Sequence, residues 1–160
     1  MEKLVIAALL ATTCAASPAN AKAERAAKCI IPTEAQVGAW FGDFNYAWAT
    51  KNPDIVTGMF AMDAVLLATV SNKPRLNHTD IRDYFETFLK SSPVGTINST
   101  TFRLGCNSAA RLGTWTVALT NAATGAKTDV KARYTFLYKL EGGKWKIDHL
   151  HSSAMPEKTS

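Results

Sequence analysis

The spacing of the hydrophobic residues changes once along this chain of 160 residues, close to Pro93. Before that point apolar residues recur every three or four positions, which is the period of a helix packed on one side. After it they alternate with polar residues, which is the period of a half-buried strand. Helices followed by a run of strands are typical of an α+β domain. We therefore predict one α+β domain, a curved antiparallel sheet packed around a long N-terminal helix plus two shorter helices.

The first predicted helix carries the strongest local signals. Thr33 followed by Gln36 is a capping-box pair, which marks the start of a helix. The apolar residues that follow recur at helical spacing, and they are Val37, Trp40, Phe41, Phe44 and Trp48. A stripe of this kind is what a helix needs in order to pack against a sheet, so we expect it to lie in the core.

Two shorter helices and one strand are expected before the change of period. Asn52 and Pro53 predict the cap and the first residue of a second helix. A strand is expected at residues 65–69. Thr79 is expected to cap a third helix, whose apolar residues lie within 81–89.

Turn signals divide the second half of the chain into antiparallel strands. They lie at Gly105, at residues 121–125 and at Gly142-Gly143. Side chains two apart on a strand point to the same side. We therefore expect the last strand to direct one set of residues toward the first helix, namely Trp145, Ile147, His149 and His151.

The N-terminal segment has the pattern of a signal peptide. Lys3 precedes an apolar run at 4–11, and the small-residue site Ala19-Asn20-Ala21 follows. We predict cleavage after Ala21 and a periplasmic or secreted protein. The apolar run is too short for a membrane span of about 20 residues, so no span is expected. Residues 22–32 would form an N-terminal arm, 33–156 the domain and 157–160 a short tail.

The charge pattern argues against a nucleic-acid partner. The formal net charge is +5, but the basic residues are scattered singly and no aromatic residues are interleaved with them. No cofactor motif or metal motif is recognised, and none is predicted.

Two cysteines follow the predicted cleavage site, Cys29 and Cys106. An oxidising compartment allows a disulfide between them, and two buried free thiols are the alternative. Closing a loop of this length would add roughly 4 kcal/mol in the chain-entropy estimate.

Four interpretations of His149 and His151 remain open. The pair could be structural, hydrogen-bonded to the backbone or to Ser153. It could hold a polar or anionic ligand, or act as a general acid and base. It could also supply two metal ligands, but a third would have to come from His78 or a carboxylate.

The segment at 143–156 carries a family resemblance. Its sequence, GKWKIDHLHSSAMP, contains the pattern G-K-W-x-I-x-H-x-H-x-S-x-x-P. This pattern resembles the closing strand of the calcium/calmodulin-dependent protein kinase II association domain. The predicted order of helices and strands is similar to the wider nuclear transport factor two-like superfamily, which has a cystatin-like fold. That superfamily includes ketosteroid isomerases and SnoaL-like cyclases.

The resemblance implies a cone-shaped fold with a pocket between the long helix and the concave sheet. It also implies a sheet surface that forms a homodimer or a higher homo-oligomer. It also implies that an arginine of the penultimate strand lines the pocket, and Arg133 is the counterpart here. The chain has no kinase domain and no calmodulin-binding segment, so neither kinase activity nor calmodulin as a partner is expected.

These observations lead to two functional hypotheses. The leading one is an exported, self-associating domain without catalytic activity, which binds a small polar or anionic ligand through Arg133, His149 and His151. Aromatic and β-branched residues on the outer sheet face would drive the association. The alternative is an isomerase or cyclase that uses the same cavity. It requires a carboxylate base, but the candidate acids are expected to be solvated, and these are Asp43, Asp54 and Asp63.

Overall fold

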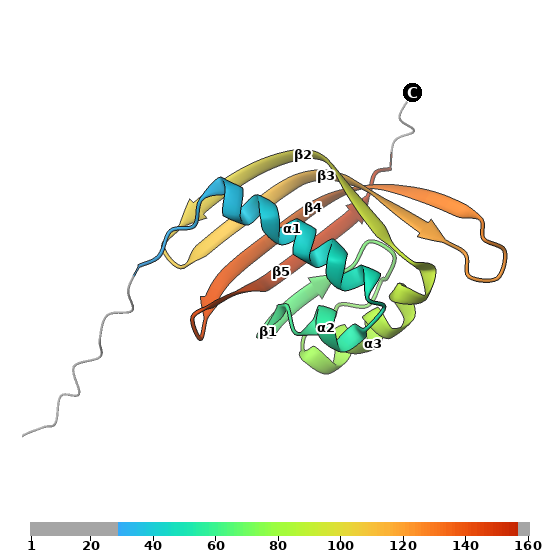
Figure 1. Cartoon of the computed structure of the whole chain (residues 1–160), viewed down its shortest axis with the longest axis horizontal. Helices are drawn as coiled ribbons and strands as arrows, with labels where there is room; N and C mark the ends of the chain where they lie inside the picture. The colour runs from blue at the N-terminus through green and yellow to red at the C-terminus, as the bar shows by residue number, and fades with distance from the viewer. Residues whose placement is uncertain (1–28, 157–160) are drawn as a thin grey trace, which may run out of the picture.

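The computed structural model describes residues 29–156, and their arrangement is α+β as predicted (Figure 1). The predicted signal peptide at 1–21, most of the arm at 22–32 and the tail at 157–160 lie outside the described residues. The elements follow the chain in this order: α1 Glu34–Ala49, α2 Pro53–Thr57, β1 Phe60–Leu67, α3 His78–Phe88, the short 3-10 turn η1 Leu89–Ser91, β2 Val94–Gly105, β3 Ser108–Thr120, β4 Lys127–Glu141 and β5 Lys144–Ala154.

The five strands form one curved sheet in the order β1-β5-β4-β3-β2. Strands β2 to β5 are antiparallel to their neighbours, as expected, but β1 pairs with β5 in parallel. The sheet is therefore mixed rather than fully antiparallel. Helix α1 lies across its concave side, and α2 and α3 gather at the C-terminal end of α1 (Figure 1).

The cap predicted for α1 is confirmed. The Gln36 amide donates to Thr33 Oγ1 at 3.2 Å, and the Thr33 amide donates to Gln36 Oε1 at 2.8 Å. Each side chain thus satisfies a backbone donor that has no partner within the helix. The cap orients α1 so that Phe44 and Trp48 are buried against the sheet.

Two predicted boundaries are wrong. The first strand spans Phe60–Leu67 rather than 65–69, because it pairs with β5 at Phe60 as well as at 65–67. The cap of α3 is Asn77 and not Thr79, since Asn77 Oδ1 accepts from the Asp80 amide at 2.9 Å. An asparagine two positions earlier therefore supplied the capping oxygen.

Aromatic side chains connect the helices to the concave face of the sheet. The ring of Phe44 lies 5.3 Å from that of Phe136 and 6.4 Å from those of Phe60 and Phe85, in edge-to-face arrangements. Each such pair stabilises the fold by about 0.5–1.5 kcal/mol beyond the contribution from burying apolar surface. This cluster sets the height at which α1 lies above the sheet.

The cysteine pair left open by the sequence is joined in the structure. Cys29 and Cys106 form a disulfide with 5.0 Å between their Cα atoms. Two hydrogen bonds lie beside it, because the Ile30 amide donates to Asn107 Oδ1 and the Asn107 amide donates to the Ile30 carbonyl. The segment before α1 is thereby fastened to the β2–β3 turn.

Reduction of this disulfide should destabilise the domain. The bond closes a loop with a sequence separation of 77, so its loss should lower the free energy of unfolding by about 4 kcal/mol. Urea unfolding with and without dithiothreitol measures the difference. The variant with both Cys29→Ser and Cys106→Ser is the control, since reductant should not change its midpoint. An equal midpoint for the wild type in both conditions would contradict the prediction.

Candidate functional site

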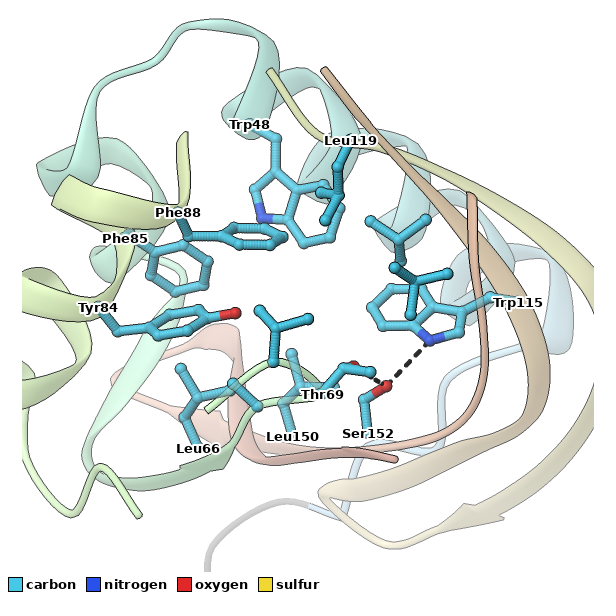
Figure 2. Close-up of a pocket in the computed structure, with 14 residues that line it drawn as sticks. Trp48, Leu66, Thr69, Tyr84, Phe85, Phe88, Trp115, Leu119, Leu150 and Ser152 are labelled. Carbon is cyan, nitrogen blue, oxygen red and sulfur yellow. Dashed lines mark hydrogen bonds between the residues drawn. The ribbon is translucent and has the colours of Figure 1, made fainter. Parts of the chain in front are cut away.

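A hollow opens between the helices and the concave sheet (Figure 2). The space that no atom fills, counted out through the open mouth into solvent, is about 410 Å³. Most of the side chains around it are apolar. The lining residues are Trp48, Leu66, Ala68, Thr69, Val70, Tyr84, Phe85, Phe88, Trp115, Val117, Leu119, Val130, Leu150 and Ser152.

Helices α1 and α3 supply the aromatic wall of the hollow. Trp48 comes from the last turn of α1, and Tyr84 and Phe88 are one turn apart on the same side of α3. The rings of Tyr84 and Phe88 stack at 5.2 Å, and the ring of Phe88 meets that of Trp48 edge-on at 5.3 Å. The wall is therefore continuous from one helix to the other.

The sheet supplies the opposite wall and its hydrogen-bonding groups. The indole Nε1 of Trp115 donates to Ser152 Oγ at 3.0 Å, across strands β3 and β5. The hydroxyl of Thr69 donates to the same oxygen. Ser152 is 6% exposed, so this small network connects β3, β5 and the turn after β1 in a nearly dry position.

The phenol of Tyr84 is held in its neutral form. Burial raises the pKa of Tyr84 above its ordinary value of 10.0, and the positive charge of Arg75 offsets part of the rise. The Arg75 guanidinium carbon lies 5.7 Å from the centre of the Tyr84 ring. At neutral pH the phenol can therefore donate a hydrogen bond but cannot act as a base.

The buried phenols should make the protein lose stability in alkali. The folded-state pKa of Tyr84 and of Tyr138 is raised, so the unfolded state releases these protons first. Their contribution is complete below the unfolded-state pKa of about 10 and declines as the pH rises above it. Urea unfolding from about pH 8 to about pH 11 should show that Tyr84→Phe loses less free energy of unfolding than the wild type. The double variant with Tyr138→Phe should lose less again. A double variant that loses as much stability as the wild type would contradict this.

The predicted inward orientation of His149 and His151 is wrong, because β5 contains a β-bulge. Ile147 pairs with Tyr138 but His149 pairs with Leu137, so Asp148 is an extra residue between two ladder positions. Such an insertion reverses the alternation that follows. Leu150 and Ser152 therefore point to the concave side, and both histidines point to the outer face. Neither histidine is among the residues that line the hollow.

Arg133 also lies on the outer face. Its neighbours Ala132 and Tyr134 are buried on the concave side, and the Arg133 side chain is exposed on the other. The arginine that faces the helix is Arg111 of β3, which is 6% exposed. Its guanidinium donates to the Gly38 carbonyl at 3.2 Å and lies 5.2 Å from the centre of the Phe41 ring. Arg111 is not among the cavity-lining residues.

The structure brings the two histidines together, but away from the cavity. Their ring centres are 6.4 Å apart. Partial burial lowers the pKa of His149, and the adjacent His151 lowers it further. Ligand binding by this pair and Arg133 stays a prediction. The third metal ligand that we considered, His78, contacts the carbonyl oxygens of Phe60 and Ala61 through Nε2, and residues 29–156 contain no cluster of metal-ligating side chains.

The candidate catalytic acids also lie outside the hollow. Asp54 accepts a hydrogen bond from Arg82 Nε at 2.7 Å, Asp63 pairs with Lys139, and Asp43 is exposed on α1. Sequence reasoning missed Ser152 and Thr69 as cavity residues. For Ser152 the sequence did contain a signal. Leu150 is the apolar residue between the two histidines and so indicates which side of β5 faces the core, and Ser152 shares that side.

The fold is the cystatin-like fold found in nuclear transport factor 2-like proteins. A superfamily member from Salmonella enterica matches with a TM-score of 0.67 at 13% identity, over 79% of this chain and 92% of that chain. At that identity the likeness shows the fold alone.

The particular family is shown by a family model. The model of the calcium/calmodulin dependent protein kinase II association domain matches residues 33–156, so the chain belongs to this family, as the C-terminal pattern predicted. A crystal structure from Xanthomonas campestris, described by the same domain name, is 48% identical with a TM-score of 0.76, over 79% of this chain and 91% of that one. No curated protein matches the chain significantly.

The association domain of the Caenorhabditis elegans kinase shares the fold. Its TM-score is 0.61 at 13% identity, over 75% of this chain and 94% of that chain. Among residues 29–156 no helix has the length and apolar character needed to cross a membrane.

Proposed function

We propose that this protein is an exported, self-associating domain that holds a small, neutral, mainly apolar ligand in the hollow between α1, α3 and the sheet. The observation that carries the proposal is the lining of the hollow, which consists of aromatic and aliphatic side chains with a few converging hydroxyl and indole groups. This combination is typical of small-molecule sites.

The lining chemistry supports a neutral ligand over an anionic one. The residues that line the hollow in the described part of the chain include no arginine, lysine or histidine to balance a negative charge. Burying an uncompensated charge in such a place is costly. The polar or anionic ligand expected from the sequence depended on Arg133, His149 and His151, which lie on the other face of the sheet.

The same lining supports binding over isomerase or cyclase chemistry. General acid–base catalysis needs a group that changes protonation near the working pH, within hydrogen-bond reach of the substrate. The titratable side chain in the lining set is Tyr84, whose pKa is raised further from neutrality. A neutral phenol with hydroxyl and indole donors can orient a ligand without moving its protons.

The outer face of the sheet supports self-association. Leu112 and Leu137 are 36% and 37% exposed there, although both lie in the middle of long strands. The aromatic residues of the sheet point inward instead, so the outer face is aliphatic and polar rather than aromatic as expected. We define the outer-face patch as Val65, Leu67, Leu112, Leu137, His149 and His151, which adjoin one another through the strand pairing.

A second copy of the chain is the occupant that we propose for this patch. Membership of an association-domain family supports it, and so does the extent of the patch over four strands. Two sheets can pack face to face over such a surface. Export is supported by the signal-peptide pattern and by the disulfide, since such bonds persist in oxidising compartments.

A fluorescent probe tests the cavity. Phenylnaphthylamine is neutral and brightens in apolar surroundings, so it should bind and should raise the melting temperature of the protein. Anilinonaphthalene sulfonate has the same rings with an added negative charge, and we expect it to bind at least tenfold more weakly. Val130→Phe, which fills the hollow from β4, should abolish binding of the neutral probe.

The matched control carries His149→Ala and His151→Ala on the outer face. This variant should bind the neutral probe like the wild type. If the histidine variant loses binding while Val130→Phe retains it, the ligand site lies on the outer face and the cavity proposal is wrong.

Charge placed on the outer-face patch should prevent self-association. Light scattering after size-exclusion chromatography should show an oligomer for the wild type at micromolar concentration. Leu112→Lys combined with Leu137→Lys should give a monomer, because like charges would meet in the centre of the contact. Leu76→Lys is the control, since Leu76 is 60% exposed but lies outside the patch. A monomeric wild type would refute self-association, and an oligomeric double variant would refute the choice of surface.

A further inference from the structure

One hydrogen-bond donor in the wall of the hollow has no partner. The indole of Trp48 is 3% exposed, and its Nε1 has no acceptor among residues 29–156. Figure 2 shows the nitrogen on the edge of the ring that is turned toward the hollow. Leaving a buried N–H group in this state is unfavourable, because the group has lost its hydrogen bond to water and has gained none in the protein.

The second tryptophan of the hollow provides a direct comparison. Trp115 is equally buried, at 2% exposed, but its Nε1 donates to Ser152 Oγ at 3.0 Å. The fold therefore satisfies one indole from within and leaves the other facing the cavity. Leucine or phenylalanine at position 48 would fill the same core position without an unpaired donor. The indole nitrogen thus has no role in the packing that we have described.

The side chains around Trp48 indicate which kind of ligand could accept a hydrogen bond from its indole N–H. Phe85 and Phe88 beside it are flat and apolar, and they suit a ring. The phenol of Tyr84, whose hydroxyl is also turned to the hollow in Figure 2, is a neutral donor on the same wall. Donors on this wall call for an acceptor on the ligand. A neutral carbonyl oxygen meets that need without bringing a charge into an uncharged site.

We propose that Trp48 Nε1 is the specificity-determining donor of the hollow, and that it selects neutral ring compounds that carry a carbonyl oxygen. This inference rests on the proposed function, because it assumes that the hollow binds a small molecule. It adds the chemical class of that molecule and the atom that recognises it. The oxygen lies against the helical wall, and the ring system extends toward the aliphatic side chains of β3 and β5.

Two probes of nearly equal shape test the proposal. Acetylnaphthalene carries a carbonyl group, and ethylnaphthalene is the hydrocarbon counterpart without the oxygen. Titration calorimetry with the full-length chain should show about tenfold tighter binding of the ketone than of the hydrocarbon. Trp48→Phe should remove this preference, so that the ketone and the hydrocarbon bind with similar affinity. Trp115→Phe is the matched control, and it should keep the preference because its N–H is already bonded within the protein.

Nitrogen–proton correlation spectra of the wild-type protein give a second measurement that does not depend on a variant folding. The sequence has four tryptophans, so the indole region should show four signals. The ketone should shift the Trp48 indole proton downfield, and the hydrocarbon should shift it much less.

The outcomes distinguish the role of Trp48 from the proposal that the hollow binds a small molecule. Equal affinity for both probes, with equal shifts of the indole signal, would overturn the role of Trp48 while the cavity proposal stands. Failure of both probes to bind, together with failure of the neutral fluorescent probe, would overturn the cavity proposal and the inference with it. A preference lost in Trp115→Phe and kept in Trp48→Phe would assign the donor to the other indole.

Discussion

The packing of α1 against the concave sheet is the interaction on which the other features depend. Phe44 lies at its centre, in contact with rings from β1, α3 and β4. These large side chains hold the helix above the sheet along its middle, whereas its last turn meets α3 instead. The hollow lies at that end, because the rings of Trp48 and Phe88 form a wall there rather than filling the gap to the sheet.

The two faces of the sheet have different chemistry, and this difference assigns their roles. The concave face is aromatic and encloses a nearly uncharged hollow, in which Ser152, Thr69 and Trp115 are hydrogen-bonded to one another. The outer face carries Arg133, both histidines and the partly exposed leucines. Ligand binding in the hollow and self-association through the outer face are therefore separate proposals, which concern opposite sides of the same strands.

One extra residue in β5 decided which side the histidines occupy. Strict alternation from Trp145 places them beside Ile147, but the bulge at Asp148 moves them to the opposite face. A bulge depends on how the neighbouring strand pairs, and β4 and β1 lie on either side of β5. The Asp148 carboxylate accepts from Lys139 of β4 at 2.9 Å, an interaction that becomes visible only when the two strands are adjacent.

The sequence by itself determined the fold class, the capping of α1, the aromatic core and the family, because each depends on residues that are close in the chain or on a periodic pattern. Only the tertiary structure decided that β1 runs parallel to β5 and that the histidines face outward. It also decided that one buried indole is bonded and the other is not. These features depend on contacts between residues far apart in the chain, and local spacing carries no information about which distant groups will meet.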